Sequence, residues 1–233
     1  MLKTRVIPVL TIKNERLVKS VRFSDHRNIG SYIAAVRVFN SRDVDELIFL
    51  DLDASVRGIR PELLREVTKE CFMPVTLGGG VRSLEDIQTL LNCGADKVSI
   101  NTAAVETPEL ITAGANRYGS QCIVVSIDVA EDTAGAVARA REAEARGAGE
   151  ILLTSVEHDG VMEGYNLPLI AAVSGAIRIP VIACGGAGVP AHCVAAVRIG
   201  ASAVAAASIF QYTQTTPQTI KKALVDAGFP ARV

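Results

Sequence analysis

The sequence lacks tryptophan and is poor in aromatic residues, which make up 4% of its 233 residues. It also has almost no net charge, because 24 basic residues stand against 25 acidic ones and leave −1. This balance removes the electrostatic basis for broad binding to nucleic acid or to an anionic membrane, and we expect neither partner. Binding of small anionic ligands remains possible, because a few local hydrogen-bond donors bind an anion even when the chain has no net positive charge.

Cysteine is scarce and scattered. The five cysteines are odd in number, lie far apart and include no C-x-x-C pair. This pattern argues against a disulfide framework and against a zinc site. We therefore expect buried free thiols in a reducing compartment, with no metal and no cofactor.

Long hydrophobic runs and a leader are missing as well. The chain begins Met-Leu-Lys-Thr-Arg-Val-Ile-Pro, which contains no extended apolar segment and no cleavage signal. The longest apolar run, near Ala203–Ala207, is far too short to span a bilayer. These features predict a cytoplasmic protein.

What the chain has instead is a regular alternation of two patterns. Short apolar runs, typical of strands buried on both faces, alternate with longer amphipathic segments typical of helices. The expected strands are Arg5–Leu10, Glu46–Leu50, Val75–Leu77, Lys97–Ile100, Cys122–Ile127, Glu150–Leu153, Val181–Ala183 and Ala203–Ala206. The expected helices lie near residues 31–42, 60–71, 83–93, 107–117, 135–147, 166–176, 190–199 and 217–227.

Eight strands alternating with eight helices favour a closed (β/α)₈ TIM barrel over an open doubly wound sheet. No linker or low-complexity segment interrupts the pattern, so we expect one domain over residues 1–233. The two halves also resemble each other: Gly79-Gly80 matches Gly185-Gly186, and Thr102 matches Ser208, at a common offset of 106 residues. Such an internal match is typical of a two-fold half-barrel repeat.

Glycines and hydroxyls follow the expected strands at points that meet on one rim of a barrel. Glycine lets the backbone approach an anion, and helix N-termini supply free N–H groups. The sequence therefore predicts two phosphate sites on opposite sides of the barrel mouth, and hence a ligand with a phosphate at each end. Lys19, in the expected first strand-to-helix loop, is a further anion ligand. The other candidates are Gly80, Asn101 and Thr102 on one side and Gly160, Gly186 and Ser208 on the other.

Two aspartates end expected strands on the same rim. Asp128 is well placed for acid/base chemistry, with a pKa that burial would raise, and Asp51 is a second candidate. The corresponding position of the first strand holds Thr11, whose hydroxyl is no base near neutral pH.

Charged residues open four of the strands at the opposite end: Arg5, Glu46, Lys97 and Glu150. Buried charges need partners, so these two cations and two anions are expected to converge in a neutral ring at the base of the barrel.

Several of these segments together resemble HisF, the cyclase subunit of imidazole glycerol phosphate synthase, over essentially the whole chain. The resemblance implies a barrel that pairs with a HisH-type glutaminase, takes up its ammonia through a gate at the base, and reacts it with a bis-phosphorylated ligand at the mouth. Arg5, Glu46, Lys97 and Glu150 match the gate, and Asp128 matches a catalytic aspartate. The matching segments are 45–51 (DELIFLD), 78–80 (GGG), 96–105 (DKVSINTAAV), 147–155 (GAGEILLTS) and 185–188 (GGAG).

Two departures separate this chain from the family pattern. Thr11 stands where the family has its first catalytic aspartate, and the segment after Asp128 is short where the family usually has a longer hairpin. The chain is therefore similar to HisF-like paralogues found with surface-polysaccharide genes, in which the barrel supplies ammonia for amidation of a sugar with a third protein.

Three other functions stay open from the sequence. The first is a working cyclase with a substitute base, and the second is a scaffold that only activates a glutaminase. The third is a HisA-type isomerase. Both Thr11 and the ring of charges expected at the base of the barrel argue against it.

Overall fold

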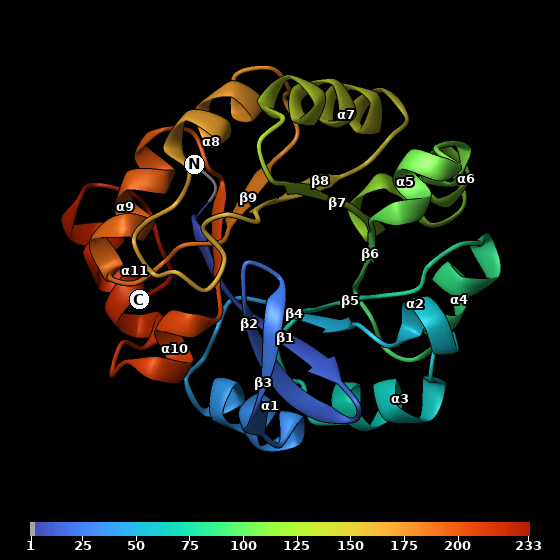
Figure 1. The fold of residues 1–233 in the computed structure, drawn as a ribbon, viewed down its shortest axis with the longest axis horizontal. Coiled ribbons are helices and arrows are strands. Elements are labelled where there is room, and N and C mark those ends of the chain that lie inside the picture. The colour runs from blue at the N-terminus through green and yellow to red at the C-terminus, as the bar shows by residue number, and fades with distance from the viewer. Residues whose placement is uncertain (1–2) are drawn as a thin grey trace.

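The computed structural model describes residues 3–233, which form a closed ring of parallel strands surrounded by helices (Figure 1). Strand β1 (Arg5–Lys13) pairs in parallel with β4 (Leu47–Asp51) on one side and with β10 (Ala203–Ala206) on the other, which closes the ring. The (β/α)₈ barrel expected from the sequence is confirmed. The other barrel strands are β5 (Val75–Gly78), β6 (Lys97–Ile100), β7 (Ile123–Val129), β8 (Glu150–Ser155) and β9 (Val181–Cys184).

Each long helix lies within two residues of its expected bounds at both ends. The N-terminus of α4 shows why such boundaries are predictable: Ser83 accepts from the backbone N–H of Asp86, whose carboxylate accepts from the N–H of Ser83. The long helices are α1 (Tyr32–Ser41), α3 (Pro61–Lys69), α4 (Leu84–Asn92), α6 (Glu109–Tyr118), α7 (Thr133–Ala145), α8 (Leu167–Ser174), α9 (Pro190–Arg198) and α11 (Pro217–Asp226).

Short helices that the sequence did not predict follow three of the strands. They are α2 (Ala54–Arg57) after β4, α5 (Thr102–Glu106) after β6 and α10 (Ser208–Tyr212) after β10, and a single 3₁₀ turn (Ser120–Cys122) precedes β7. Helices α5 and α10 have equal length and an offset of 106 residues, which also separates β5 from β9, β6 from β10 and α4 from α9. The half-barrel repeat is therefore present in the architecture as well as in the sequence.

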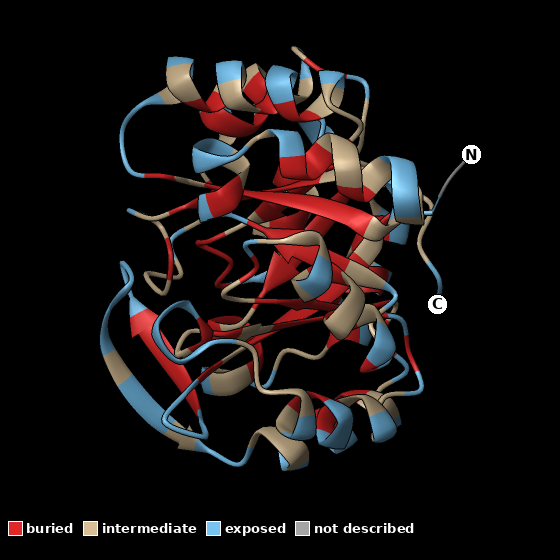
Figure 2. Ribbon diagram, turned by 90° about the vertical axis from the view of Figure 1, so that its right-hand side faces the viewer, coloured by how far each residue is buried: buried red, intermediate tan, exposed pale blue. Residues whose placement is uncertain are grey.

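Two apolar layers hold the barrel together, as alternation along buried strands requires. Ile7 and Val9 of β1 point inside the barrel, and Val6 and Leu10 point outward into the layer beneath the helices. Figure 2 shows both layers as the buried centre of the molecule. The five cysteines are free thiols, and no helix of residues 3–233 is long and apolar enough to cross a membrane.

An antiparallel hairpin follows the first strand, where the sequence predicted a loop. Strands β2 (Arg16–Val21) and β3 (Ser24–Gly30) extend from β1, so Lys19 lies in a strand and not in a loop. Asn14 and Glu15 form the two-residue turn, with φ of +49° and +55°. A two-residue turn with positive φ at both positions matches the twist of paired strands. The hairpin projects from one end of the barrel (Figure 2).

Candidate functional site

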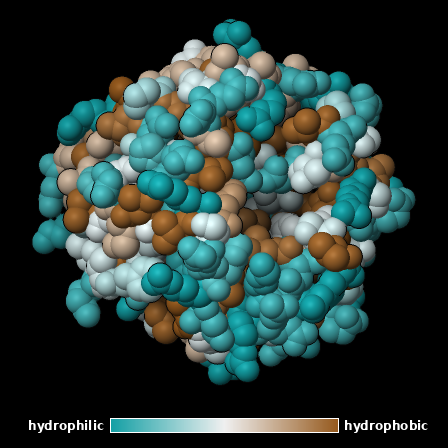
Figure 3. Space-filling model, in the orientation of Figure 1, coloured by the Kyte–Doolittle hydropathy of each residue, from teal (hydrophilic) through white to brown (hydrophobic). Residues whose placement is uncertain are grey.

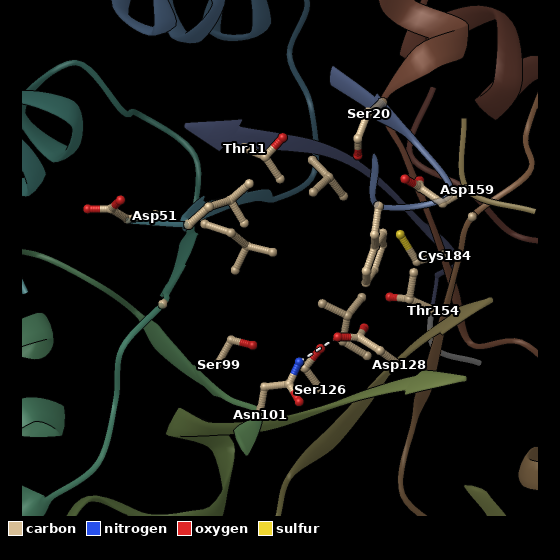
Figure 4. A pocket seen from close by; sticks show the side chains of 18 of the residues that line it. Thr11, Ser20, Asp51, Ser99, Asn101, Ser126, Asp128, Thr154, Asp159 and Cys184 are labelled. Carbon is tan, nitrogen blue, oxygen red and sulfur yellow. Dashed lines mark hydrogen bonds between the residues drawn. The ribbon is translucent and has the colours of Figure 1, made fainter. Parts of the chain in front are cut away.

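A cavity of about 520 Å³ lies at the carboxyl ends of the barrel strands. Figure 3 shows this face hollowed near its middle, and Figure 4 shows the side chains within. Every rim residue singled out in the sequence lines this one cavity: Thr11, Lys19, Asp51, Gly80, Asn101, Thr102, Asp128, Gly160, Gly186 and Ser208. The closed barrel thus gathers residues that are up to 197 positions apart, from Thr11 to Ser208, around a single space.

Asp128 is the carboxylate best placed for acid/base chemistry. It lies near the end of β7 and accepts a hydrogen bond of 2.6 Å from the side-chain amide of Asn101 (Figure 4). Burial raises the pKa of Asp128 above its ordinary value, although hydrogen bonds from Asn101 and Thr154 oppose the shift by favouring the charged form. A carboxyl with a raised pKa in a cavity exchanges protons closer to neutral pH than an exposed one.

Thr11 and Asp51 do not supply a second free carboxylate. The hydroxyl of Thr11 donates to the carbonyl of Val18 at 2.8 Å, so it is committed to the hairpin. Asp51 is 2% exposed and accepts two hydrogen bonds of 2.9 Å from Arg60. Its carboxylate points away from Thr11 and Asp128 in Figure 4. The geometry therefore favours a structural role for Asp51 over the catalytic one that the sequence left open.

One expected phosphate site has the backbone shape that an anion needs. Gly80 has φ of +70°, and a Cβ there would collide with the backbone carbonyl of Ala54. Asn101 precedes Thr102, the first residue of α5. Only glycine fits such a close approach without strain. The structure brings these residues together, and phosphate binding there stays a prediction.

The opposite side of the cavity repeats this arrangement at Gly186 and Ser208. Gly186 has φ of +113° and packs against the backbone of Gly164. Ser208 begins α10, is 5% exposed, and its hydroxyl has no hydrogen-bond partner in the described chain. Buried hydroxyls are normally satisfied, so this one is free to receive a ligand oxygen. Gly160 lies nearby against Ser20 of the hairpin.

Lys19, expected to be an anion ligand, is paired with a carboxylate. Its ammonium lies 2.8 Å and 3.0 Å from the two carboxylate oxygens of Asp159, and both side chains are largely buried. The charge of Lys19 is therefore already compensated within the cavity wall. A phosphate that binds Lys19 has to compete with Asp159.

At the other end of the barrel, the four strand-opening charges form the expected ring. Arg5 lies 2.6 Å from Glu46 and 2.7 Å from Glu150, and Lys97 lies 2.9 Å and 2.8 Å from the same two carboxylates. Each cation therefore bridges both anions. The ring closes the base of the barrel with no net charge.

Four residues of the cavity and the charged ring were not predicted from the sequence. Thr76 donates to Glu46 at 2.9 Å and so belongs to the charged ring. Asp159, which follows β8, pairs with Lys19. Thr154 and Cys184 lie between Asp128 and Asp159 in Figure 4, and burial raises the pKa of the Cys184 thiol to about 12. The signal for all four was their place at a strand end, or inside a strand in the case of Thr76.

Comparison with known proteins agrees with this geometry. A family profile described as histidine biosynthesis protein matches residues 5–216. A Campylobacter jejuni protein, provisionally named imidazole glycerol phosphate synthase subunit hisF2, is 46% identical over the full length of both chains. Proteins named imidazole glycerol phosphate synthase subunit HisF are 46% identical in Caulobacter vibrioides and 48% in Hyphomonas neptunium; they cover all of this chain and 97% and 99% of their own.

Proposed function

Because the chain belongs to the HisF family of imidazole glycerol phosphate synthase subunits, we propose that it is the synthase subunit of a glutamine amidotransferase. In this proposal a HisH-type glutaminase docks at the base of the barrel and releases ammonia there. The barrel then conducts the ammonia to the cavity at its mouth.

The observation that carries the proposal is the charged ring of Arg5, Glu46, Lys97 and Glu150. A buried ring of four charges adds little to stability by itself, because desolvation offsets the attraction between the charges. A role in the passage of ammonia through the base of the barrel explains the presence of this ring. Beyond the ring the barrel interior is apolar, which favours neutral ammonia over an ammonium ion that would lose its hydration. The apolar interior comprises Ile7, Val9, Ile48, Val124, Leu152, Ile182, Ala203 and Ala205.

The cavity suits a ligand with a phosphate at each end. Support comes from the unpartnered hydroxyl of Ser208 on one side and from the tight Gly80 backbone on the other. The two cradles also include Asn101, Thr102, Gly160 and Gly186. When the ligand binds, the ammonium of Lys19 leaves its ion pair with Asp159 and pairs with phosphate. Asp128 is the proton donor and acceptor in this scheme.

Thr11 decides what the cavity does with the ammonia. Its hydroxyl cannot replace a carboxylate in acid/base chemistry, and removal of one member of such a pair typically costs a factor of about 10²–10⁴ in rate. We therefore infer that ring closure is lost and that the subunit delivers ammonia for amidation of a surface-polysaccharide sugar, with a third protein that binds the acceptor. Sequence identity does not separate the two branches, since it is 46% to the hisF2 relative and 46–48% to the HisF relatives.

The second candidate is a working cyclase of histidine biosynthesis. The free hydroxyl of Ser208 favours it, because a chain that has lost its bis-phosphorylated substrate has no need of that cradle.

An assay without any glutaminase separates the two candidates. The purified protein is mixed with the bis-phosphorylated ribulosyl aminoimidazole carboxamide and an ammonium salt at mildly alkaline pH, and the fall in substrate absorbance is followed. Our proposal predicts no turnover above that of the Asp128→Asn variant, although the substrate binds. Turnover well above this control establishes a cyclase that works without the first carboxylate.

Thr11→Asp is the gain-of-function arm of the same assay, and Thr11→Asn is its matched control without a titratable group. If the rest of the cavity is intact, the aspartate variant turns the substrate over and the asparagine variant does not. Absence of any gain means that the cavity has diverged at further positions.

A further inference from the structure

A second pocket lies on the hairpin beside the main cavity. Its volume is about 330 Å³, and it is lined by Lys13, Asn14, Arg16, Val18, His26 and Asn28. Lys13 and His26 also line the main cavity, so the two spaces meet at the barrel mouth. Thr11 and Lys13 lie on the same side of β1 because strand residues two apart share a face. The pocket therefore continues the cavity wall outward along the hairpin.

Two cations lie next to each other in the wall of this pocket. Lys13 of β1 pairs directly with Arg16 of β2 in the antiparallel register. Like charges placed directly opposite each other destabilise a strand pair. A neutral residue at either position would remove this repulsion, so the arrangement needs another reason.

The acidic residues of the turn do not compensate these cations. Glu15 pairs with Arg60, and Asp53 accepts from the backbone N–H of Asn14. The ion pairs of the hairpin strands join Lys19 to Asp159 and Arg22 to Glu157. Within residues 3–233, no carboxylate lies within ion-pair distance of Lys13 or Arg16.

His26 adds a third donor and reports on the local field. Partial burial, Lys13 and Lys19 each lower its pKa, and the neighbouring Asp25 opposes them. The imidazole therefore loses its proton at a lower pH than an ordinary histidine does. An anion beside Lys13 and Arg16 reverses that balance, because it stabilises the imidazolium form.

We propose that Lys13, Arg16 and His26 form a third anion subsite at the barrel mouth, which takes a carboxylate or phosphate group of the ligand bound in the cavity. The lysine offers three N–H donors and the arginine five, and both stay charged at physiological pH. The identity of the ligand rests on the proposed function, but the anion-binding pocket on the hairpin lies outside the two phosphate cradles and is tested separately. A ligand that fills all three positions has an anionic group beyond its two terminal phosphates.

A small ligand fits this pocket better than a polyanion. The subsite is concave, opens into the cavity, and consists of three basic side chains on a chain with a net charge of −1. Extended polyanions require a broad basic surface, which a chain of this composition does not supply.

Proton NMR of histidine tests the subsite directly, since the chain has only three histidines. The His26→Gln variant identifies the His26 resonance. Sodium pyrophosphate and malonate are titrated in parallel against sodium chloride of matched ionic strength. We expect a saturable shift of the His26 resonance and a rise in its pKa with at least one of the two anions, and the tighter one identifies the group preferred.

Three variants make the outcome decisive. In Lys13→Ala/Arg16→Ala, affinity at His26 falls by roughly tenfold or more, as expected for loss of two charge-assisted contacts. Lys13→Arg keeps the charge and retains binding. Arg27→Ala removes an exposed cation of β3 that lies opposite Lys19 in the strand register and is not part of the pocket, and it leaves binding unchanged.

Two results would overturn the subsite: an equal shift in sodium chloride, or unchanged affinity in the double variant. Ser208→Asp keeps the two proposals distinguishable. It places a negative charge in the cradle at α10, so it abolishes phosphate binding there and leaves the response of His26 intact. Unchanged phosphate binding in Ser208→Asp with an intact His26 response therefore counts against the proposed function only.

Discussion

Among single residues, Asp128 differs from the other aspartates of the cavity wall in its partners. Asp51 is paired with Arg60 and Asp159 with Lys19, whereas Asp128 has only neutral hydrogen-bond partners. A carboxylate held in an ion pair stays charged and exchanges protons poorly at neutral pH. Burial raises the pKa of Asp128, so this carboxyl takes up a proton at a higher pH than an ordinary aspartate does.

Asn101 controls that protonation state. Its amide donates to the charged form of Asp128, so Asn101→Ala removes an interaction that lowers the pKa and raises that pKa further above its ordinary value. The ionised fraction of Asp128 at any given acidic pH is then smaller in the variant. Carbon-13 NMR of the Asp128 carboxyl across a pH titration measures the shift. Asn116→Ala, at an exposed position of α6, is the control, and an unchanged Asp128 titration in Asn101→Ala contradicts the assignment.

At the scale of the elements, the loop after β8 contacts the hairpin. Lys19 of β2 pairs with Asp159, and the backbone carbonyl of Asp159 accepts from the N–H of Arg22 at 2.8 Å. Gly160 allows the backbones to pack at this point, since a Cβ there would collide with the carbonyl of Ser20. This buried contact therefore adds to the pairing of β2 with β1 in positioning the hairpin over the cavity.

Asp159→Asn tests this attachment. The substitution leaves the ammonium of Lys19 buried without a counterion, which typically costs about 3 kcal/mol or more. We expect faster amide hydrogen exchange across β2 and β3 and a lower free energy of unfolding in urea. Glu157→Gln is the matched control, because it removes only the exposed pair with Arg22 at 3.8 Å, which is worth about 0–1 kcal/mol. Equal effects of the two variants would show that the buried pair does not hold the hairpin.

The charged ring also involves several elements, since β1, β6 and β8 supply Arg5, Lys97 and Glu150, and Glu46 directly precedes β4. Arg5→Ala removes one bridge between Glu46 and Glu150 and opens the base. We expect glutamine hydrolysis by the glutaminase partner to continue while delivery of ammonia to the acceptor falls, so that the ratio of product to glutamate drops several-fold. Arg146→Ala, after α7 and outside the ring, leaves the ratio unchanged. An unchanged ratio in Arg5→Ala removes the ring from the proposed route.

On the scale of the whole molecule, the two ends of the barrel expose different apolar groups. Phe72 is 91% exposed in the loop before β5, at the same end as the charged ring. The loop is held by Asn40, which accepts from the N–H of Phe72 and donates to the carbonyl of Glu70. Aromatic residues are enriched among the anchors of protein interfaces, so Phe72 is the residue we test for contact with the glutaminase.

Phe72→Ala is expected to weaken association with a HisH-type glutaminase by roughly tenfold, because aromatic anchors dominate interface energies. Its melting temperature stays that of the parent, since the side chain packs on nothing. Val56→Ala is the matched control, because Val56 is 90% exposed but lies in α2 at the mouth. Analytical ultracentrifugation of the mixed subunits measures both affinities. Equal affinities for the two variants would exclude Phe72 from the interface.

The hairpin shows where prediction from the sequence stopped short. Asn14 and Glu15 lie between runs that pair as strands, and a two-residue turn with Asn is a known hairpin signal. The eight-fold strand and helix pattern left these residues as a loop, and Lys19 was consequently placed in that loop. The short helices α5 and α10 were missed for a related reason, since five residues show too little periodicity to be recognised.

The sequence by itself determined the eight-fold alternation, the half-barrel repeat and the two rims, because these depend on local periodicity and on which end of a strand a residue occupies. It also determined that Thr11 carries no carboxylate. Only the tertiary structure decided which charges are free. Lys19 and Asp159 are 140 residues apart, and Arg5 and Glu150 are 145 residues apart, so these pairs form only when the barrel closes. Pairing across such separations depends on the closed ring, and no local pattern encodes it.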